Sequence, residues 1–175
     1  MRLFFAVNFS EREKDVLEKN VAALKKMCVR GNFSYRDNLH ITLAFLGEVD
    51  RSKLGELKDA MNAVAASPFD LCVSGAGNFG DIVWLGVDDG GSAGLKMLAS
   101  ALRTKLDRRG FYYDKKPFSP HLTVCRGAVF ADGHAAKSLD GVTTPLTARV
   151  GSFELMESTR INGKLTYKKI FSKKL

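Results

Sequence analysis

The chain of 175 residues has little of what metal centres, disulfide frameworks and membrane spans require. Its three cysteines are far apart, and no pair has the spacing of a metal-binding or redox motif. No apolar run approaches the roughly 20 residues that cross a bilayer. We therefore expect no metal, no cofactor and no membrane association, and a reducing compartment, the cytoplasm. The cysteines are interpreted as small buried hydrophobes, Cys28, Cys72 and Cys125.

The charge is unbalanced toward lysine and arginine, with a formal net charge of +8. Basic proteins attract polyanions, so nucleic acid is a natural partner. The glycine-rich segment 90–94 lacks the lysine and the spacing of a phosphate-binding loop, which argues against nucleotide hydrolysis. Charge therefore favours a nucleic-acid partner without identifying the chemistry.

One order of elements occurs twice along the chain. A strand, a helix with a capping box at Ser10 and Glu13, a short strand, a longer strand and a second helix are expected at 2–8, 11–29, 33–35, 39–46 and 52–66. The order repeats at 82–87, 92–109, 111–113, 121–126 and 131–139. Equivalent residues lie 80 or 81 positions apart, and Gly47 and Gly127 are expected to end the two longer strands.

The repeat predicts an α+β fold of two pseudo-symmetric lobes. Each lobe is expected to be an antiparallel sheet with helices packed outside, and the lobes face each other across a central cleft. Segments 69–75, 145–157 and 165–173 have the composition of strands that complete the sheets. Because no linker separates the halves, residues 1–175 are predicted to form one bilobal domain from an internal duplication, roughly 1–80 and 81–175. A monomer is expected.

A His-x-Thr-hydrophobic motif lies at matching places in the two copies. It reads His40, Thr42 in the first and His121, Thr123 in the second. Successive side chains of a strand point to opposite faces, so each His and Thr share one face about 7 Å apart. A lone histidine on a strand is usually a packed residue, but two of the three histidines stand in this motif. His134, the third, lies in neither copy and is interpreted as a surface residue.

Two histidines and two threonines in one cleft suit the opening of a cyclic phosphodiester. One neutral imidazole can deprotonate the attacking water, and one protonated imidazole can protonate the departing ribose oxygen. The threonine hydroxyls can donate to the charged oxygens on phosphorus. The substrate is already strained, so we expect the chemistry to need no metal.

At these motifs the chain resembles the RNA 2',3'-cyclic phosphodiesterases of the 2H phosphoesterase superfamily, historically called 2'-5' RNA ligases. The likeness covers almost the whole chain, including 2–7, 39–49, 77–79, 84–87, 118–126 and 153–158 with Tyr167 beyond. It implies a bilobal α+β fold and hydrolysis of RNA 2',3'-cyclic phosphate ends to 2'-phosphomonoesters. It also implies His40 and His121 as the catalytic pair, Thr42 and Thr123 on the phosphate, and 2'-5' ligation as the reverse reaction.

Three expectations depend on finer detail. We assign His40 as the acid on the leaving oxygen and His121 as the base for water, an order that sequence alone does not determine. The family pattern places a phosphate-supporting arginine at Arg126, but strict alternation would point it away from His121. A bulge or strand end near Gly127 would restore the contact. Relatives often carry an Arg-Pro step where residues 80–83 read Gly-Asp-Ile-Val, so one contact is expected to be missing here.

Softer features and competing functions remain open. Phe45 and Phe79 are candidates to stack a base, with core packing as the alternative. Residues 115–117 are either an RNA contact or a solvated loop. The competing functions are cleavage of another phosphodiester, such as a 2'-5' oligoadenylate or a small cyclic nucleotide, and RNA binding without catalysis.

Overall fold

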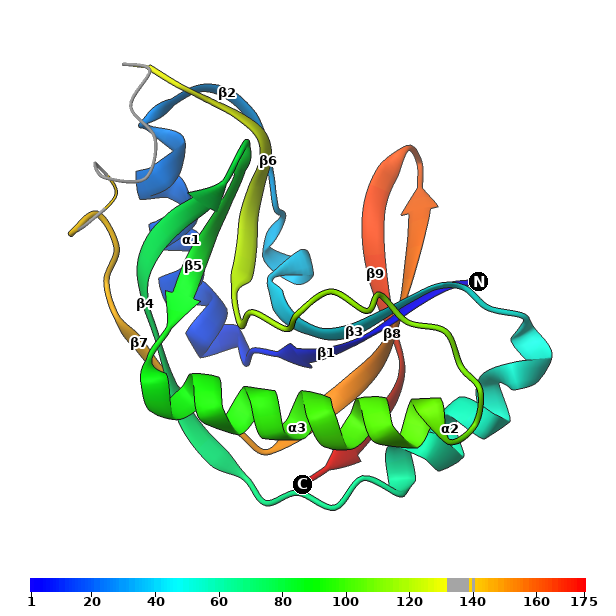
Figure 1. Cartoon of the computed structure of the whole chain (residues 1–175). Helices are drawn as coiled ribbons and strands as arrows, with labels where there is room; N and C mark the ends of the chain where they lie inside the picture. Colours follow the sequence, from blue (N-terminus) through cyan, green and yellow to red (C-terminus); the bar gives the residue numbers. More distant parts are fainter. Residues whose placement is uncertain (132–138, 140) are drawn as a thin grey trace.

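A computed structural model describes residues 1–131, 139 and 141–175 of the chain. In this part, nine strands form one curved antiparallel sheet, and three α-helices pack against it (Figure 1). The elements in chain order are β1 (Arg2–Asn8), α1 (Glu11–Lys25), β2 (Cys28–Phe33), η1 (Arg36–Asn38), β3 (His40–Glu48), η2 (Arg51–Lys53), α2 (Leu54–Asn62), β4 (Phe69–Phe79), β5 (Ile82–Val87), α3 (Asp89–Asp107), β6 (Leu122–Phe130), β7 (Leu146–Val150), β8 (Ser152–Ile161) and β9 (Lys164–Lys174).

The strand order is β7-β4-β5-β6-β3-β1-β8-β9, with β2 also paired to β6. The predicted α+β class with antiparallel pairing is confirmed. The two expected sheets are continuous, because β3 and β6 pair where Ile41 lies opposite Leu122. These two residues are 81 positions apart, the offset of the repeat. An antiparallel pair that meets at equivalent residues is locally two-fold symmetric, so the predicted pseudo-two-fold relation passes between the two motifs.

Each side of this junction contains strands from both halves of the chain. β2 and β4, from before residue 80, pair with β6 and with β5 and β7. β8 and β9, from the end of the chain, extend the sheet beyond β1. The sequence halves are therefore interleaved in space. That they arose by duplication stays a prediction.

Both strands that carry the motif continue beyond the glycines expected to end them. β3 includes Gly47 and β6 includes Gly127, and their φ angles are +74° and +64°. Glycine adopts this left-handed backbone at little cost. Each glycine therefore changes the strand's direction while pairing continues, so the predicted strand ends were wrong. In the same way, the segment predicted as one strand over 145–157 is two strands, separated at Gly151.

The first helix was predicted too long. α1 begins with the expected capping box at Ser10 and Glu13, but it ends at Lys25, and residues to Val29 do not continue it. From Cys28 the chain pairs with β6. A Cβ on Gly31 would collide with the Cys125 sulfur, so this glycine serves a close approach of two strands instead of a helix stop.

The other helices also differ at their ends. α2 begins after a 3-10 turn and stops at Asn62, short of the predicted 66, whereas α3 begins earlier, with Asp88 as its cap. The strand predicted at 111–113 is absent, because the Tyr113 hydroxyl bonds Asp107 and holds this segment to the end of α3. The predicted helical piece at 131–139 and His134 lie, except for Ala131 and Leu139, outside the described residues.

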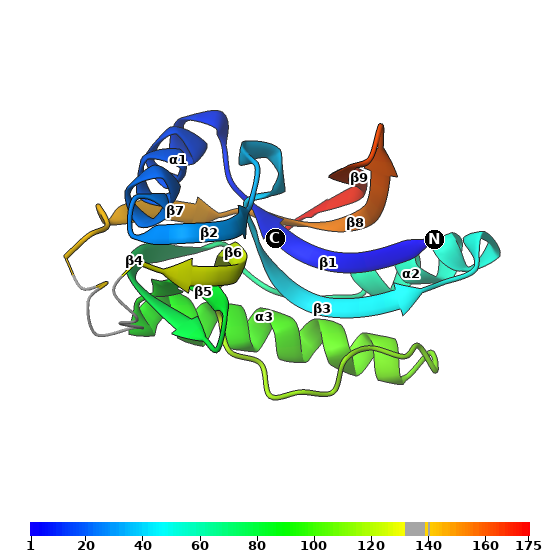
Figure 2. The same ribbon diagram turned by 90° about the horizontal axis from the view of Figure 1, so that it is seen from above.

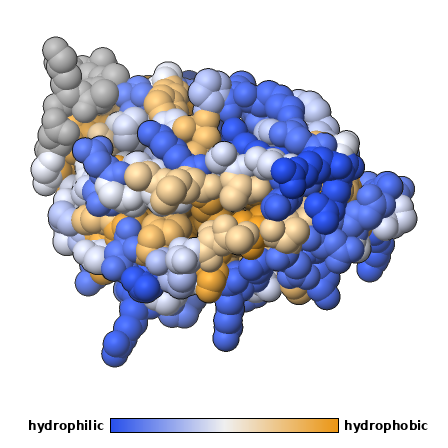
Figure 3. Space-filling model, turned by 60° about the horizontal axis from the view of Figure 1, so that its bottom comes forward, coloured by the Kyte–Doolittle hydropathy of each residue, from blue (hydrophilic) through white to orange (hydrophobic). Residues whose placement is uncertain are grey.

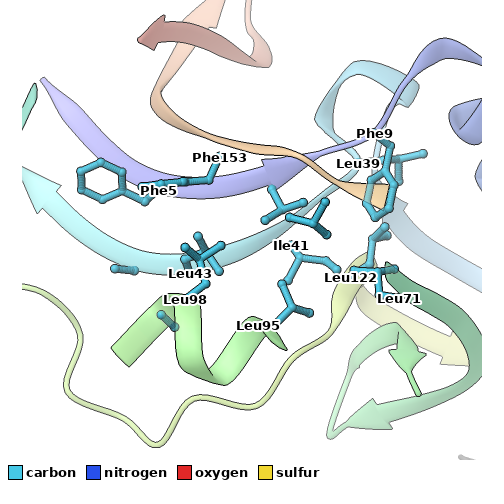
Figure 4. Close-up of a cluster of buried hydrophobic side chains, with 14 of the residues drawn as sticks. Phe5, Phe9, Leu39, Ile41, Leu43, Leu71, Leu95, Leu98, Leu122 and Phe153 are labelled. Carbon is cyan, nitrogen blue, oxygen red and sulfur yellow. The ribbon is translucent and has the colours of Figure 1, made fainter. Parts of the chain in front are cut away.

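One apolar core joins the helices to the buried face of the sheet. Figure 4 shows Ile41 and Leu122 from the junction near Leu95 and Leu98 of α3. The residues between the motif's polar positions are fully buried, Ile41, Leu43, Leu122 and Val124. The imidazoles and hydroxyls therefore stand on a rigid, packed base. Seen from below, the molecule carries an apolar band among hydrophilic side chains (Figure 3). Within the described chain, every helix is too short or too polar to cross a membrane.

Candidate active site

A cleft of about 970 Å³ lies over the junction of β3 and β6. It is lined by all seven residues that the sequence singled out: His40, Thr42, Phe45, Phe79, His121, Thr123 and Arg126. The structure therefore brings both copies of the motif to one place, and the aromatic candidates with them. The cleft walls also include Lys116, from the loop that was a candidate RNA contact. Sequence reasoning did not select the other polar and aromatic residues of the walls as site residues: Arg2, Phe4, Ser34, Asn38, Arg160 and Tyr167.

The ring of His40 is oriented by its own chain. Its Nδ1 lies 2.7 Å from the carbonyl oxygen of Asn38, and a carbonyl only accepts, so Nδ1 carries the proton in that bond. Nε2 faces the Thr42 hydroxyl at 3.0 Å. The rings of Phe4 and Tyr167 lie 5.0 and 5.1 Å from the imidazole. In the neutral ring, Nε2 is thus the atom that gains a proton.

His121 repeats this arrangement from the second lobe. Its Nδ1 lies 2.8 Å from the carbonyl oxygen of Ser119, which is again two residues before the histidine. The ring of Phe79 stands edge-on to it with centroids 5.4 Å apart. Both histidines therefore hold the same tautomer when neutral, and both have Nε2 as the atom for proton transfer.

The electrostatic environment favours a neutral His40 when the cleft is empty. Burial lowers the pKa of His40 from its usual 6.5 to about 4, and electrostatic interactions with Arg126 and His121 act in the same direction. The hydrogen bond to the Asn38 carbonyl opposes these effects. His40 is therefore uncharged in the free protein at neutral pH.

A bulge brings Arg126 into the cleft. On β6, Leu122 and Val124 are buried as alternation requires, but Cys125 is buried too, and Arg126 then faces the cleft with Thr123. The pairing of β5 with β6 slips at this place. The expected bulge thus exists, two residues before Gly127. A charge-assisted contact to an anion is now possible for Arg126.

The same irregularity occurs at the equivalent place on β3. Leu43 and Ala44 are both buried, the pairing with β1 slips there, and Phe45 turns back to the cleft. Phe45 and Arg126 are each five residues after their histidine. One lobe therefore presents an aromatic ring and the other a guanidinium from symmetric positions.

The aromatic candidates differ in their surroundings. Phe45 is partly buried against Phe4, and the Arg2 guanidinium lies 4.9 Å from its ring centroid. Phe79 is 47% exposed and packs on the Trp84 indole at 5.0 Å. Both rings line the cleft, so neither ring serves only to pack the core. Next to Phe79, Gly80 and Asp81 form the tight turn between β4 and β5.

Asn38 links the site to strand β9. Its side-chain amide donates to the Leu165 carbonyl at 3.0 Å and accepts from the Tyr167 amide at 3.3 Å. A neighbouring strand would make the same two bonds, so Asn38 closes this edge of β9 while its own carbonyl orients His40. An asparagine two residues before a motif histidine was the only sequence signal for this role.

Among the described residues, no group of three or more His, Cys, Asp or Glu side chains is placed to hold a metal ion. The three cysteines are free thiols. Cys125 is buried as predicted, whereas Cys28 and Cys72 are only partly buried. Burial raises the pKa of the Cys125 thiol to about 11, so this sulfur acts as a packed hydrophobe behind the motif strand.

The fold and the paired motifs are those expected of the 2H phosphoesterase superfamily. The family model of the 2'-5' RNA ligase superfamily matches residues 14–162, and the chain belongs to this family. A crystal structure of Escherichia coli LigT with 3'-AMP is 30% identical, with a TM-score of 0.83 over 99% of this chain and 97% of that one.

Curated relatives carry the name RNA 2',3'-cyclic phosphodiesterase. The protein from Archaeoglobus fulgidus is 38% identical over 72% of each chain, and the one from Thermotoga maritima is 31% identical over 91% of this chain and 87% of its own. A relative from Geobacillus stearothermophilus is 32% identical over 81% of this chain, which spans 48% of that longer protein. The family prediction is confirmed, and the predicted enzyme class agrees with the name of these relatives.

Proposed function

We propose that this protein hydrolyses 2',3'-cyclic phosphate ends of RNA to 2'-phosphomonoesters, with His40 and His121 as acid and base. The observation that carries the proposal is the meeting of two His-x-Thr motifs at one cleft, with Nδ1 of each histidine bonded to a backbone carbonyl and Nε2 left as the atom that can exchange a proton. The names of the relatives support the substrate class.

The reaction needs one proton removed and one delivered. Nε2 of one histidine takes a proton from water as its oxygen forms a bond to phosphorus. The bond from phosphorus to the ribose O3' then breaks, and Nε2 of the other histidine protonates that oxygen. The phosphate stays on O2'. The histidines exchange protonation states during the reaction, and solvent restores them.

The threonines and Arg126 hold the phosphate. In the free cleft the Thr42 hydroxyl donates to Nε2 of neutral His40. We infer that a bound phosphate takes over this hydroxyl, which frees Nε2 for proton transfer. Thr123 contributes the equivalent donor, and Arg126 supplies positive charge to the non-bridging oxygens.

We keep His40 as the acid and His121 as the base, and the low pKa of His40 adds a condition to that order. His40 lacks the proton in the free protein. An anionic phosphate beside it offsets the charge of Arg126 and favours the imidazolium. Binding of substrate therefore has to raise the pKa of His40 before it acts as an acid.

An RNA 5'-hydroxyl in the place of water would follow the same steps in the same direction. That oxygen would attack phosphorus while O3' leaves, the phosphate would stay on O2', and a 2'-5' linkage would form. We propose ligation as the minor reaction, since water is present at far higher concentration than RNA ends.

The proposal is tested with a short RNA that ends in a 2',3'-cyclic phosphate, incubated in EDTA with the wild type, His40→Ala and His121→Ala. We expect a 2'-phosphate from the wild type and a rate at least a hundredfold lower from each variant. A wild type active only after addition of a divalent ion would overturn the metal-free mechanism. If the wild type does not hydrolyse the cyclic phosphate of this RNA but cleaves a 2'-5' oligoadenylate, the substrate assignment is wrong.

A further inference from the structure

The β8–β9 hairpin projects from the sheet next to β1 (Figures 1 and 2). Residues of both of its strands line the cleft, among them Arg160, Leu165 and Tyr167. From Ser158 to the end of the chain the hairpin carries six lysines and arginines and no aspartate or glutamate. Lysine also protects exposed edges from aggregation, so charge alone does not define a site. The position of the hairpin's tip, which contacts Tyr35 and continues into the cleft lining, is the second observation that points to a binding site.

The tip of the hairpin contacts residues 35–38, the segment that precedes β3. Lys164 lies with its ammonium 3.8 Å from the centroid of the Tyr35 ring. One step further along β9, Asn38 bonds the Leu165 carbonyl, which fixes the register of the hairpin against η1. Tyr35 is 52% exposed, so the ring remains available to a ligand although it contacts Lys164. The result is a fixed surface with an aromatic ring and a cation side by side.

This surface is continuous with the cleft from two sides. Arg160 and Leu165, opposite each other near the hairpin's end, line the cleft, and Leu165 directly follows Lys164. On the other side, Ser34 lines the cleft and directly precedes Tyr35. Tyr35 therefore lies next to the cleft on the side of the hairpin's tip. We call Tyr35, Arg160, Lys164 and Leu165 the ledge.

The cations of the ledge are not neutralised within the described part of the chain. There, no carboxylate lies within ion-pair distance of Lys164, and Arg160 donates to the backbone carbonyl of Gly163. The two carboxylates of the cleft wall are paired elsewhere: Glu48 with the terminal amine and Asp114 with Lys116. An approaching polyanion thus meets positive charge at the ledge.

We propose that the ledge binds the nucleotides that precede the cyclic phosphate in single-stranded RNA. Tyr35 would stack one base, and Lys164 and Arg160 would contact the phosphates on either side of it. Stacking of a base on an exposed aromatic ring beside cations is how proteins hold single strands without reading their sequence. The inference rests on the proposed function, and it makes an RNA several nucleotides long the preferred substrate.

The test separates binding along the strand from chemistry at its end. Affinity is measured by fluorescence anisotropy with a labelled five-nucleotide RNA that ends in a 2'-phosphate, so no turnover is needed. Hydrolysis is measured on a single nucleoside 2',3'-cyclic phosphate. The variants are Lys164→Gln, Tyr35→Ala and Tyr35→Phe. Lys19→Gln, an exposed lysine of α1 outside the cleft lining, is the charge-matched control.

We expect Tyr35→Ala to weaken binding of the five-nucleotide RNA roughly fivefold or more, and Tyr35→Phe to retain it. Lys164→Gln should lower the slope of log affinity against log salt by about 0.7, the value for one lost phosphate contact on a single strand. Lys19→Gln should leave that slope unchanged. Hydrolysis of the single nucleotide should stay at the wild-type rate in all four variants.

Two results would contradict the proposal that the ledge binds RNA. One is wild-type affinity and salt dependence in both Tyr35→Ala and Lys164→Gln. The other is an equal loss on the single nucleotide and on the longer RNA, which would show that these residues act only through the catalytic pair. If the wild type hydrolyses no cyclic phosphate, the proposed function fails, and the anisotropy measurement still decides the ledge. Thermal unfolding of each variant identifies any loss that follows from misfolding.

Discussion

Measuring the pKa of His40 is the most direct test of the proposed mechanism. Burial holds it near 4, compared with the usual 6.5. At 1.36 kcal/mol for each pKa unit, the difference corresponds to about 3 kcal/mol against the charged ring. At pH 7, roughly one molecule in a thousand therefore carries the proton on His40 in the free protein. We predict that a bound 2'-phosphate raises this fraction strongly.

The sign of the effect also applies to stability. The folded protein prefers neutral His40, so the unfolded chain binds a proton more readily as the pH falls. Stability is fully retained above pH 6.5 and is lost progressively as the pH falls toward 4, by about 3 kcal/mol in total. His40→Asn has no such titration, so its stability relative to the wild type should improve by about that amount between pH 7 and pH 4.

Both consequences are measurable on the same samples. The imidazole signals of His40, assigned with His40→Asn, are followed by NMR from pH 3.5 to 8 with and without adenosine 2'-phosphate. Urea unfolding at pH 7 and pH 4 gives the change in stability for the wild type and the variant. Arg126→Gln is the third sample. Because the charge of Arg126 lowers the pKa of His40, its removal should raise that pKa.

Several outcomes would refute this reasoning. A free-protein titration of His40 near 6.5 would show that its surroundings do not disfavour the charged ring. A pKa that stays low when the 2'-phosphate is bound would exclude His40 as the acid and would assign it the role of base. An Arg126→Gln variant whose His40 titrates as in the wild type would place the guanidinium too far away to act on the pair.

Three further predictions concern the packing and the phosphate contacts. Leu122→Ala, at the fully buried junction of the two lobes, should lower the free energy of unfolding by about 2–5 kcal/mol in urea. Ser10→Ala removes the capping box of α1 and should cost about 1 kcal/mol in the same assay. Thr42→Val keeps the shape of the side chain but removes the donor, so kcat/KM on a cyclic phosphate RNA should fall roughly a hundredfold; an unchanged value would remove Thr42 from the phosphate site.

The meeting of the two His-x-Thr motifs at one cleft could be predicted from the sequence, because it follows from the residues of two strands and the repeat. Alternation along a strand places His40 with Thr42, and the offset of 81 residues relates them to His121 and Thr123. The apolar residues between them require one buried face, which the structure has. Nothing beyond the strand's period of two and the repeat was needed to expect one cleft.

The features that were predicted wrongly, or not at all, depend on contacts between residues that are far apart in the sequence. Val29 and Gly31 follow a helical stretch, and they belong to a strand only because the residues next to them in β2 pair with β6. Gly47 and Gly127 resemble strand ends, but the neighbouring strands continue to pair past them. The role of Asn38 was not expected either, because its partners on β9 lie 127 and 129 residues later in the chain.

The matching bulges explain how a nearly symmetric scaffold supports a reaction with direction. The histidines, their carbonyl partners and their threonines occupy equivalent positions, so these groups alone do not distinguish acid from base. The bulges on β3 and β6 bring the fifth residue after each histidine into the cleft, and there the lobes differ: Phe45 on one side and Arg126 on the other. Burial and the charge of Arg126 both disfavour the imidazolium of His40, whereas Phe45 carries no charge. In the proposed mechanism the bound phosphate has to offset this effect before His40 acts as the acid, so the difference between the lobes comes from burial and from two side chains at equivalent backbone positions.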